Sequence, residues 1–157
     1  MMFDVSQIRK KTVAADEYID GLDSPFKQKF LERKQTYQLN IEIVEQLKGF
    51  ARKYLAVAFS AVWCKDCVSN IPVLALVSEK TGLEVRIFGG IKKDPLSHSH
   101  KWRIPPSPPE TELYNIEKLP TILILDLDGR EIGRIVENPK KQPTLEQELL
   151  EIIKLQK

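Results

Sequence analysis

Two cysteines separated by two residues are the part of this sequence best suited to chemistry. They are Cys64 and Cys67 in the run Trp63-Cys64-Lys65-Asp66-Cys67, and the chain has no other cysteine. Two thiols at this spacing on the first turn of a helix are close enough to form a small disulfide ring, and they can also supply half of a zinc or iron–sulfur site. The pattern therefore predicts either redox chemistry or metal binding.

The elements expected around the pair favour the redox interpretation. The apolar run Tyr54 to Ser60 predicts a strand buried on both faces. The segment Lys65 to Lys80 predicts a helix that Pro72 kinks without ending it. Cys64 then lies at a helix N-terminus, where unpaired amides and the helix dipole favour a thiolate. We expect Cys64 to be the attacking thiol and Cys67, one turn further in, the resolving thiol.

The residues between the cysteines should act on Cys64 in opposite directions. The ammonium of Lys65 should stabilise the thiolate, and the carboxylate of Asp66 should disfavour it by like-charge repulsion. Asp66 is also the one carboxylate that the sequence guarantees to be near. It is either a proton acceptor for the resolving thiol or an exposed surface charge.

The rest of the C-terminal part predicts a mixed sheet covered by helices on both faces. Further strands are expected at 83–88, 121–127 and 131–136, with Asp128-Gly129 as a hairpin turn and Gly82 as a helix stop. A last helix should follow Pro143-Thr144, with an apolar inner side made of Leu145, Leu149, Ile152, Ile153 and Leu155. The fold class is therefore α/β.

Residues 1–53 predict a helical N-terminal extension. A short helix is expected from Thr12 or Ala14 to Gly21, and Ser24-Pro25 should cap and open a stronger one. One or two helices then carry an apolar stripe with a solvated basic back of Lys27, Lys29, Arg33 and Lys34; the stripe comprises Phe26, Phe30, Tyr37, Ile41, Val44, Leu47 and Ala51. The stripe should face the core; the alternative is a partner-binding or membrane-surface helix.

Residues 89–111 predict an ordered, proline-rich surface loop that is neither helix nor central strand. The loop carries His98 and His100, which together with Cys64 and Cys67 make four possible zinc ligands. Their spacing departs from that of known zinc motifs, so we do not predict a metal site. Trp102 is interpreted as a packing anchor for the loop; a stacking platform is the alternative.

Composition limits the remaining function classes. The 157 residues, 42% of them hydrophobic, predict one soluble domain spanning 1–157. A net charge of +2 and short cationic runs argue against a nucleic-acid partner, and no apolar stretch is long enough for a membrane span. Without a disulfide framework or an apolar leader, the chain is expected to act in the cytoplasm as a monomer.

The motifs resemble those of the thioredoxin family over residues 54–156. The matching features are the W-C-x-x-C at Trp63 to Cys67, Pro72, the tripeptide Leu119-Pro120-Thr121 and the hairpin Ile122 to Val136. The resemblance implies a thioredoxin-like mixed sheet and a cis Pro120 that faces the cysteine pair. Without the cysteine motif, a trans proline that starts an edge strand would be the simpler interpretation of Pro120.

Three features depart from the family pattern. Lys65-Asp66 stands where thioredoxins usually have Gly-Pro, and Ala58 stands where family members place a buried acid. The loop Ile91 to Thr111 and the first 50 or so residues are longer than a minimal member needs. The usual proton acceptor for the second thiol is therefore absent, and substrate choice is expected to be unusual.

The function expected from these residues is thiol–disulfide exchange that reduces disulfides in protein substrates without a cofactor. Trp63 should shape the rim of the site, and the backbone of Leu119 beside Pro120 should pair with an extended substrate segment. A reductase or another dithiol would return the electrons. The alternative is a thioredoxin-fold binding module whose cysteines hold metal between two chains or are inactive.

Overall fold

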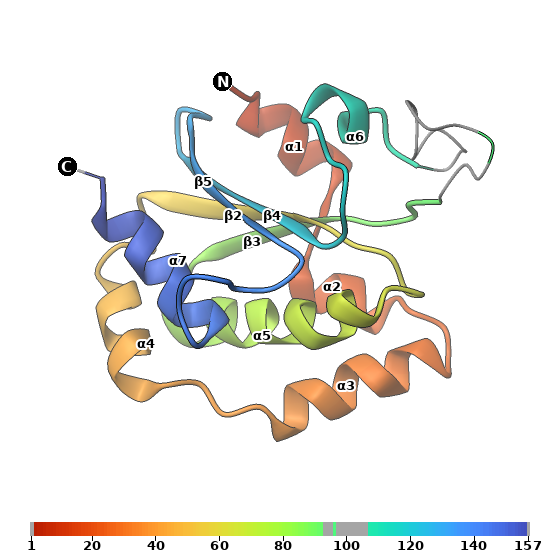
Figure 1. Cartoon of the computed structure of the whole chain (residues 1–157), viewed down its shortest axis with the longest axis horizontal. Helices are drawn as coiled ribbons and strands as arrows, with labels where there is room; N and C mark the ends of the chain where they lie inside the picture. The colour runs from red at the N-terminus through yellow and green to blue at the C-terminus, as the bar shows by residue number, and fades with distance from the viewer. Residues whose placement is uncertain (1, 93–95, 97–106, 157) are drawn as a thin grey trace.

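The computed structural model describes residues 2–92, 96 and 107–156, and these form a mixed sheet between two layers of helices (Figure 1). The five strands lie in the order β1-β3-β2-β4-β5, and only β2 and β3 run parallel. The strands are β1 (Val13–Ala14), β2 (Tyr54–Phe59), β3 (Glu84–Phe88), β4 (Thr121–Asp126) and β5 (Glu131–Val136). The expected thioredoxin-like α/β fold is confirmed.

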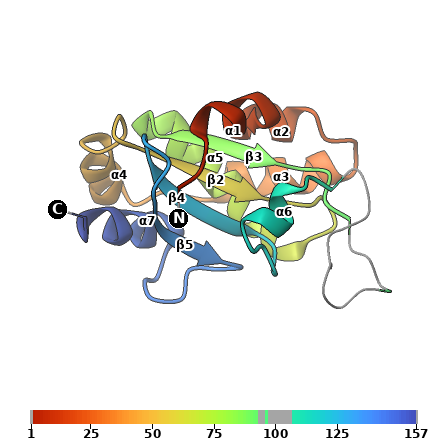
Figure 2. The ribbon, with the colours of Figure 1, turned by 90° about the horizontal axis from the view of Figure 1, so that it is seen from above.

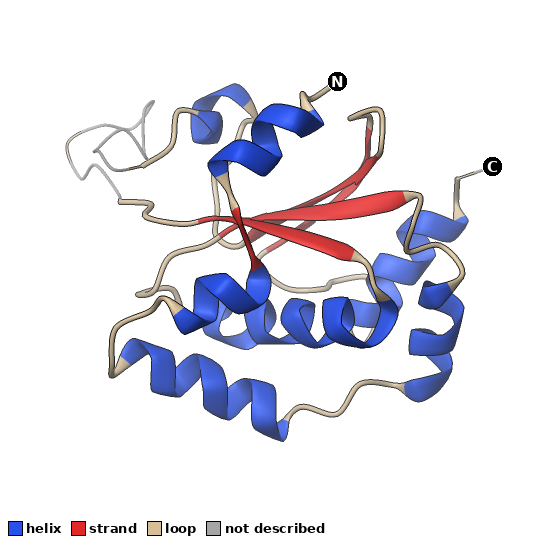
Figure 3. Cartoon of the chain, turned by 180° about the vertical axis from the view of Figure 1, so that it is seen from behind, coloured by secondary structure: helices blue, strands red, loops and turns tan. Residues whose placement is uncertain are grey.

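Helices cover both faces of the sheet, as Figures 1 and 3 show. One face carries α1 (Val5–Lys11) and the short α6 (Glu110–Leu113), which Figure 2 shows from above. The other face carries α2 (Ala15–Asp20), α4 (Ile41–Lys48), α5 (Lys65–Thr81) and α7 (Leu145–Lys154). The remaining helix, α3 (Phe26–Thr36), packs on α5 as an outer layer, away from the sheet.

The central strands are apolar because they are covered on both faces. In β2, the residues from Leu55 to Phe59 are all fully buried, with β3 on one side and β4 on the other. Ala58 lies opposite Ile87 of β3 and Ile122 of β4. The position where the family places a buried acid therefore holds a methyl group inside an apolar sheet.

Helix α5 follows β2 and carries the cysteine motif at its start. Cys64 is its N-cap residue, and the helix runs through Pro72 without ending. It stops at Gly82, which has a left-handed φ of 81° that glycine adopts at little cost. The expected strand-to-helix connection is present, and it places Cys64 at the unpaired amides of the first helical turn.

The N-terminal extension is not simply helical, because it also contributes a strand. Val13 and Ala14 pair antiparallel with Ile87 and Arg86, so β1 forms one edge of the sheet. The amide of Phe3 donates to the carbonyl of Gly129 at 2.7 Å, which ties the start of the chain to the β4–β5 turn. The first residues thus cross one face of the sheet and are part of the fold.

The apolar stripe expected between Phe26 and Ala51 is interrupted. Helix α3 begins one residue after Pro25, which follows a cis Ser24–Pro25 bond and takes the N-cap place expected for Ser24. The chain is extended from Tyr37 to Asn40, so α4 starts with a new rotational phase. Phe26 and Ile41 are consequently exposed, contrary to the expected inward stripe.

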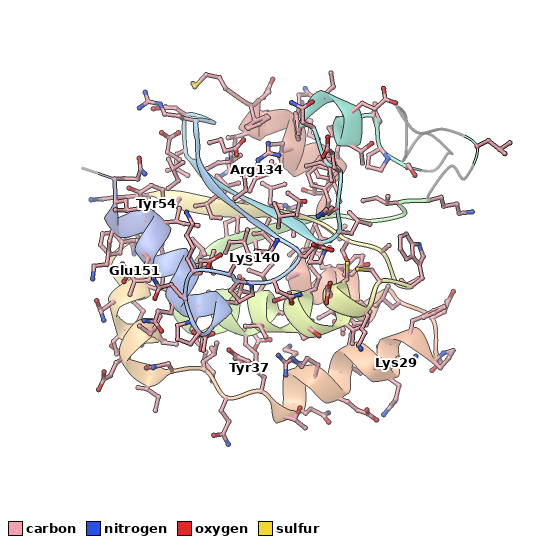
Figure 4. The ribbon with its side chains drawn as sticks, viewed as in Figure 1. Lys29, Tyr37, Tyr54, Arg134, Lys140 and Glu151 are labelled. Atoms are coloured by element: carbon pink, nitrogen blue, oxygen red, sulfur yellow. The ribbon has the colours of Figure 1, made fainter. Side chains whose placement is uncertain are left out.

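The basic residues of α3 do not all face solvent as expected. Lys29 does, and Figure 4 shows it on the outer side of the helix. Arg33 instead donates to the carbonyl of Ser69 on α5 and lies over the ring of Tyr37. Lys34 forms ion pairs with side chains of α2 and α5. These cations fasten α3 to the layer below it.

Two expectations near the C-terminal half are corrected in part. Glu110 to Leu113 is a helical turn, although residues 89–111 were expected to lack helix, and Leu155 is exposed because α7 ends at Lys154. His98, His100 and Trp102 lie outside the described residues. Within the described part of the chain, none of the helices has the length and apolar character needed to cross a membrane.

Candidate functional site

The cysteine pair lies where β2 passes into α5. The amide of Ser60, one residue after β2, donates to the carbonyl of Phe88 at 3.0 Å, and the amide of Cys64 donates to the carbonyl of Ala61 at 3.3 Å. The turn between them presents Trp63, which is 53% exposed and donates from its indole nitrogen to the carbonyl of Ile91 at 3.3 Å. Trp63 therefore forms part of the rim beside the pair.

Cys64 faces the Leu119–Pro120 segment. Its thiol donates to the carbonyl of Leu119 at 3.4 Å, across 55 residues of sequence. The Leu119–Pro120 peptide bond is cis, and the Cys64 side chain is largely covered, with 8% of its surface exposed. The structure thus brings together the two segments that the family resemblance placed side by side.

Hydrogen bonds hold the pKa of the Cys64 thiol at about 7, below its usual value. The main cause is a hydrogen bond from the Cys67 side chain, and the amides of Cys67 and Asp66 add to it. The Cys67 amide lies 3.3 Å from the Cys64 sulfur. Burial and the Asp66 carboxylate act in the opposite direction. Near neutral pH, a large fraction of Cys64 is therefore the nucleophilic thiolate.

Cys67 behaves in the opposite way. Its side chain is fully buried, and burial is the main cause that raises the pKa of its thiol. The neighbouring Cys64 raises this pKa further, while the Ala61 amide and the Ser60 hydroxyl lower it in part. Both cysteines are free thiols in this structure. The pair therefore consists of one acidic sulfur at the surface and one protonated sulfur beneath it.

The two intervening residues act differently from each other. Lys65 is exposed and is not among the groups that set the pKa of Cys64, so its expected help to the thiolate is not seen. The Asp66 carboxylate raises the pKa of Cys64, in the expected direction. Asp66 is half-buried, with its carbonyl accepting from the Asn70 side chain at 2.8 Å.

The sequence alone did not identify two hydroxyl groups beside Cys67. Ser60 is fully buried, and its hydroxyl lies within hydrogen-bonding reach of the Cys67 sulfur. The hydroxyl of Tyr18, on α2, lies 3.0 Å from that of Ser60. Gly89 makes room for this tyrosine, since a Cβ atom there would meet the Tyr18 ring at 2.8 Å. Only Ser60, next to the motif, could have been suspected from sequence.

A buried asparagine ties the start of α5 to the segment after β5. The Asn70 side-chain amide donates to the carbonyls of Asp66 and Glu137 and to the side chain of Asn138, at 2.8–2.9 Å. The Glu137 amide in turn donates to the carbonyl of Pro120 at 2.7 Å. This chain of hydrogen bonds connects the cysteine helix to the cis-proline segment, and no local sequence pattern predicts it.

The described residues do not form a metal centre beyond the cysteine pair. Among them, no group of three or more histidine, cysteine, aspartate and glutamate side chains is arranged to hold an ion. The structure therefore offers two thiols at a helix N-terminus, facing a cis proline, as its candidate reactive groups.

Fold and site together define a thioredoxin-like protein. A sequence model of the family described as thioredoxin matches residues 12–101, more than half of the chain. The chain therefore belongs to the thioredoxin family. The match begins at β1 and includes α2, so it reaches further toward the N-terminus than the motifs recognised in the sequence.

Solved structures agree with this assignment at the level of the fold. The chain is similar to a protein of unknown function from Pseudomonas aeruginosa, with 18% identity, a TM-score of 0.73 and 98% of each chain covered. It is similar to an HIV epitope-scaffold, with 15% identity, a TM-score of 0.73, and coverage of 99% of this chain and 100% of that one.

A thioredoxin pre-protein from Schistosoma mansoni aligns less closely, with 21% identity, a TM-score of 0.38, and coverage of 64% of this chain and 81% of that one. A search of curated protein sequences finds no match.

Proposed function

We propose that this protein is a thiol–disulfide oxidoreductase that reduces disulfides in protein substrates through Cys64 and Cys67. The observation that carries the proposal is the asymmetry of the two thiols. Cys64 has a pKa of about 7 at the N-cap of α5, whereas the pKa of the buried Cys67 is raised. A dithiol that attacks with one sulfur and resolves with the other needs this difference.

The reaction begins when the Cys64 thiolate attacks one sulfur of a substrate disulfide. A Cys64–substrate bond forms, the substrate S–S bond breaks, and the other substrate sulfur leaves as a thiolate. Cys67 then loses its proton and attacks Cys64, which releases the second substrate thiolate. Two electrons and two protons pass to the substrate. Another dithiol must reduce the resulting Cys64–Cys67 disulfide.

The surroundings of Cys64 suit an extended protein segment. The Leu119 carbonyl, which accepts the Cys64 thiol at 3.4 Å, is free to pair with a substrate backbone once Cys64 is ionised or bonded to the substrate. The exposed Trp63 offers an apolar contact on the other side of the sulfur. Residues of the site thus supply both a backbone acceptor and an aromatic surface.

The proposal is tested by reduction of insulin disulfides with wild type, Cys64→Ser and Cys67→Ser. Wild type should be active and both variants inactive. Cys67→Ser should accumulate a mixed disulfide with a protein substrate, because the resolving thiol is missing, and Cys64→Ser should not. Wild type without activity, or a trapped disulfide on Cys67, would reject the assignment. A metal that co-purifies with both thiols would favour the binding-module alternative instead.

A further inference from the structure

The resolving thiol, Cys67, lies against a pair of buried hydroxyl groups from outside the cysteine motif. Ser60 comes from the end of β2 and Tyr18 from α2, 42 residues earlier in the sequence. Their hydroxyl oxygens are 3.0 Å apart, and Ser60 also reaches the Cys67 sulfur. The three groups form a line from the N-terminal extension to the sulfur.

The direction of the hydrogen bonds follows from the number of protons. A serine hydroxyl has one proton, so if Ser60 donates to the Cys67 sulfur it must accept from Tyr18. Tyr18 can serve as this donor at any working pH, because burial raises the pKa of its phenol to about 12. The chain of donation therefore runs from Tyr18 to Ser60 to a thiolate on Cys67.

The need for such donors is clear from what surrounds Cys67. Among the described residues, the groups that act on its pKa are Cys64, Ser60 and the amide of Ala61, with no carboxylate among them. The carboxylate of Asp66 acts on Cys64 instead. Ala58, at the place of the family's buried acid, carries no polar group at all. A fully buried thiolate without a donor would be strongly disfavoured.

We propose that Ser60 is a catalytic residue, and Tyr18 a positioning residue, for the step in which Cys67 resolves the mixed disulfide. The proposal rests on the proposed thiol–disulfide exchange. Ser60 donates to the Cys67 sulfur as it loses its proton, and Tyr18 holds the Ser60 proton toward that sulfur. The Cys67 proton passes to the leaving substrate sulfur, the Cys64–Cys67 bond forms, and the Cys64–substrate bond breaks. The hydroxyl pair gains and loses no net proton.

The structure also explains how Tyr18 is held in place. Its ring lies edge-on to Phe30 of α3, with ring centroids 6.0 Å apart, and it occupies space that Gly89 leaves open after β3. The residue is 9% exposed. Ring packing and the hydroxyl contact are therefore separable, since a phenylalanine at position 18 keeps the ring and removes only the donor.

The test compares wild type with Ser60→Ala, Tyr18→Phe and the double variant. The first readout is the rate at which a preformed mixed disulfide on Cys64 resolves, measured as a function of pH. Loss of a donor to a charged sulfur should slow resolution about tenfold in Ser60→Ala and move the pH profile up by about one unit. Tyr18→Phe should slow it less, about threefold, and should add nothing in the Ser60→Ala background.

The second readout requires no activity. The pKa of Cys67 in the reduced protein is measured from the pH dependence of its ¹³Cβ resonance by NMR, and it should rise in Ser60→Ala and Tyr18→Phe. The matched control is Tyr37→Phe, which removes another buried phenol hydrogen bond, to Glu146 at 2.7 Å, away from the cysteines. It should lower stability without moving the pH profile. Figure 4 shows Tyr37 between α3 and α4.

The outcomes separate this inference from the proposed function. If wild type reduces no disulfide, the proposed function fails, and the NMR titration still decides whether the hydroxyls act on Cys67. If wild type is active and the two single variants resolve mixed disulfides at the wild-type rate and pH, the inference is overturned. Additive effects of Tyr18→Phe and Ser60→Ala would also overturn it, since Tyr18 would then not act through Ser60.

Discussion

The acidity of Cys64 should depend on the side chain of Cys67 in a way that two substitutions at one position separate. The hydrogen bond from Cys67 is the main cause that brings the pKa of Cys64 to about 7. Cys67→Ala removes this donor, whereas Cys67→Ser replaces the thiol with a hydroxyl donor. The backbone amide of residue 67, at 3.3 Å from the Cys64 sulfur, remains in both variants.

The size of the effect follows from the strength of the lost bond. A hydrogen bond to a charged group contributes roughly 1.5 to 3 kcal/mol, and a thiol is a weak donor, so about 1.4 kcal/mol or one pKa unit is expected. The pKa of Cys64 should rise from about 7 to roughly 8 in Cys67→Ala. Its thiolate fraction at pH 7 then falls from about one half to about one tenth, a fivefold loss.

The assay is the rate of iodoacetamide modification of Cys64 between about pH 5 and about pH 10, checked by the ultraviolet absorbance of the thiolate. Cys67→Ser should titrate within about half a unit of wild type because it keeps a donor. The reasoning is refuted if Cys67→Ala titrates like wild type. It is also refuted if Cys67→Ser rises as far as Cys67→Ala, because the loss would then not be that of a donor.

Three further outcomes are expected. Asp66→Asn should lower the pKa of Cys64 by less than about one unit, because Asp66 is half-exposed and screened; a rise in the alkylation titration would contradict this. The depressed pKa of Cys64 should stabilise the reduced protein over Cys64→Ser by about 1.5 kcal/mol near pH 8.5, a gain lost as the pH falls through about 7; equal urea unfolding differences at both ends would refute it. Gly89→Ala should cost roughly 1–3 kcal/mol by displacing the ring of Tyr18, unless melting temperatures of the two proteins coincide.

The sequence predicted well those parts whose signals are local. The buried strand β2, the helix α5 and the hairpin of β4 and β5 each have an apolar pattern or a turn signal within a few residues, and each is present. The placement of Cys64 at a helix N-cap followed from the same patterns. The proximity of Leu119 to Cys64 did not, because it rests on a contact across 55 residues and was expected only through the family resemblance.

The parts that were missed depend on contacts between distant segments. Strand β1 has two residues, too few for a periodic pattern, and exists because it pairs with β3. Ile41 was placed in the core by helical spacing, but the extended stretch before it resets the phase. Tyr18 is an ordinary tyrosine in a short helix until the fold brings Ser60 to it. Tertiary packing, not local preference, decides all three positions.

The hydrogen bonds of Asn70 have a consequence for recognition. They join the first turn of α5 to Glu137, whose amide bonds the Pro120 carbonyl, so the parts of the chain on either side of the Cys64 sulfur form one cross-braced frame. Such a frame loses little conformational entropy when a partner arrives, and it does not widen to admit a bulkier one. A disulfide must therefore come to this protein on a segment that is already extended or able to unfold locally, so the flexibility that exchange requires resides in the substrate.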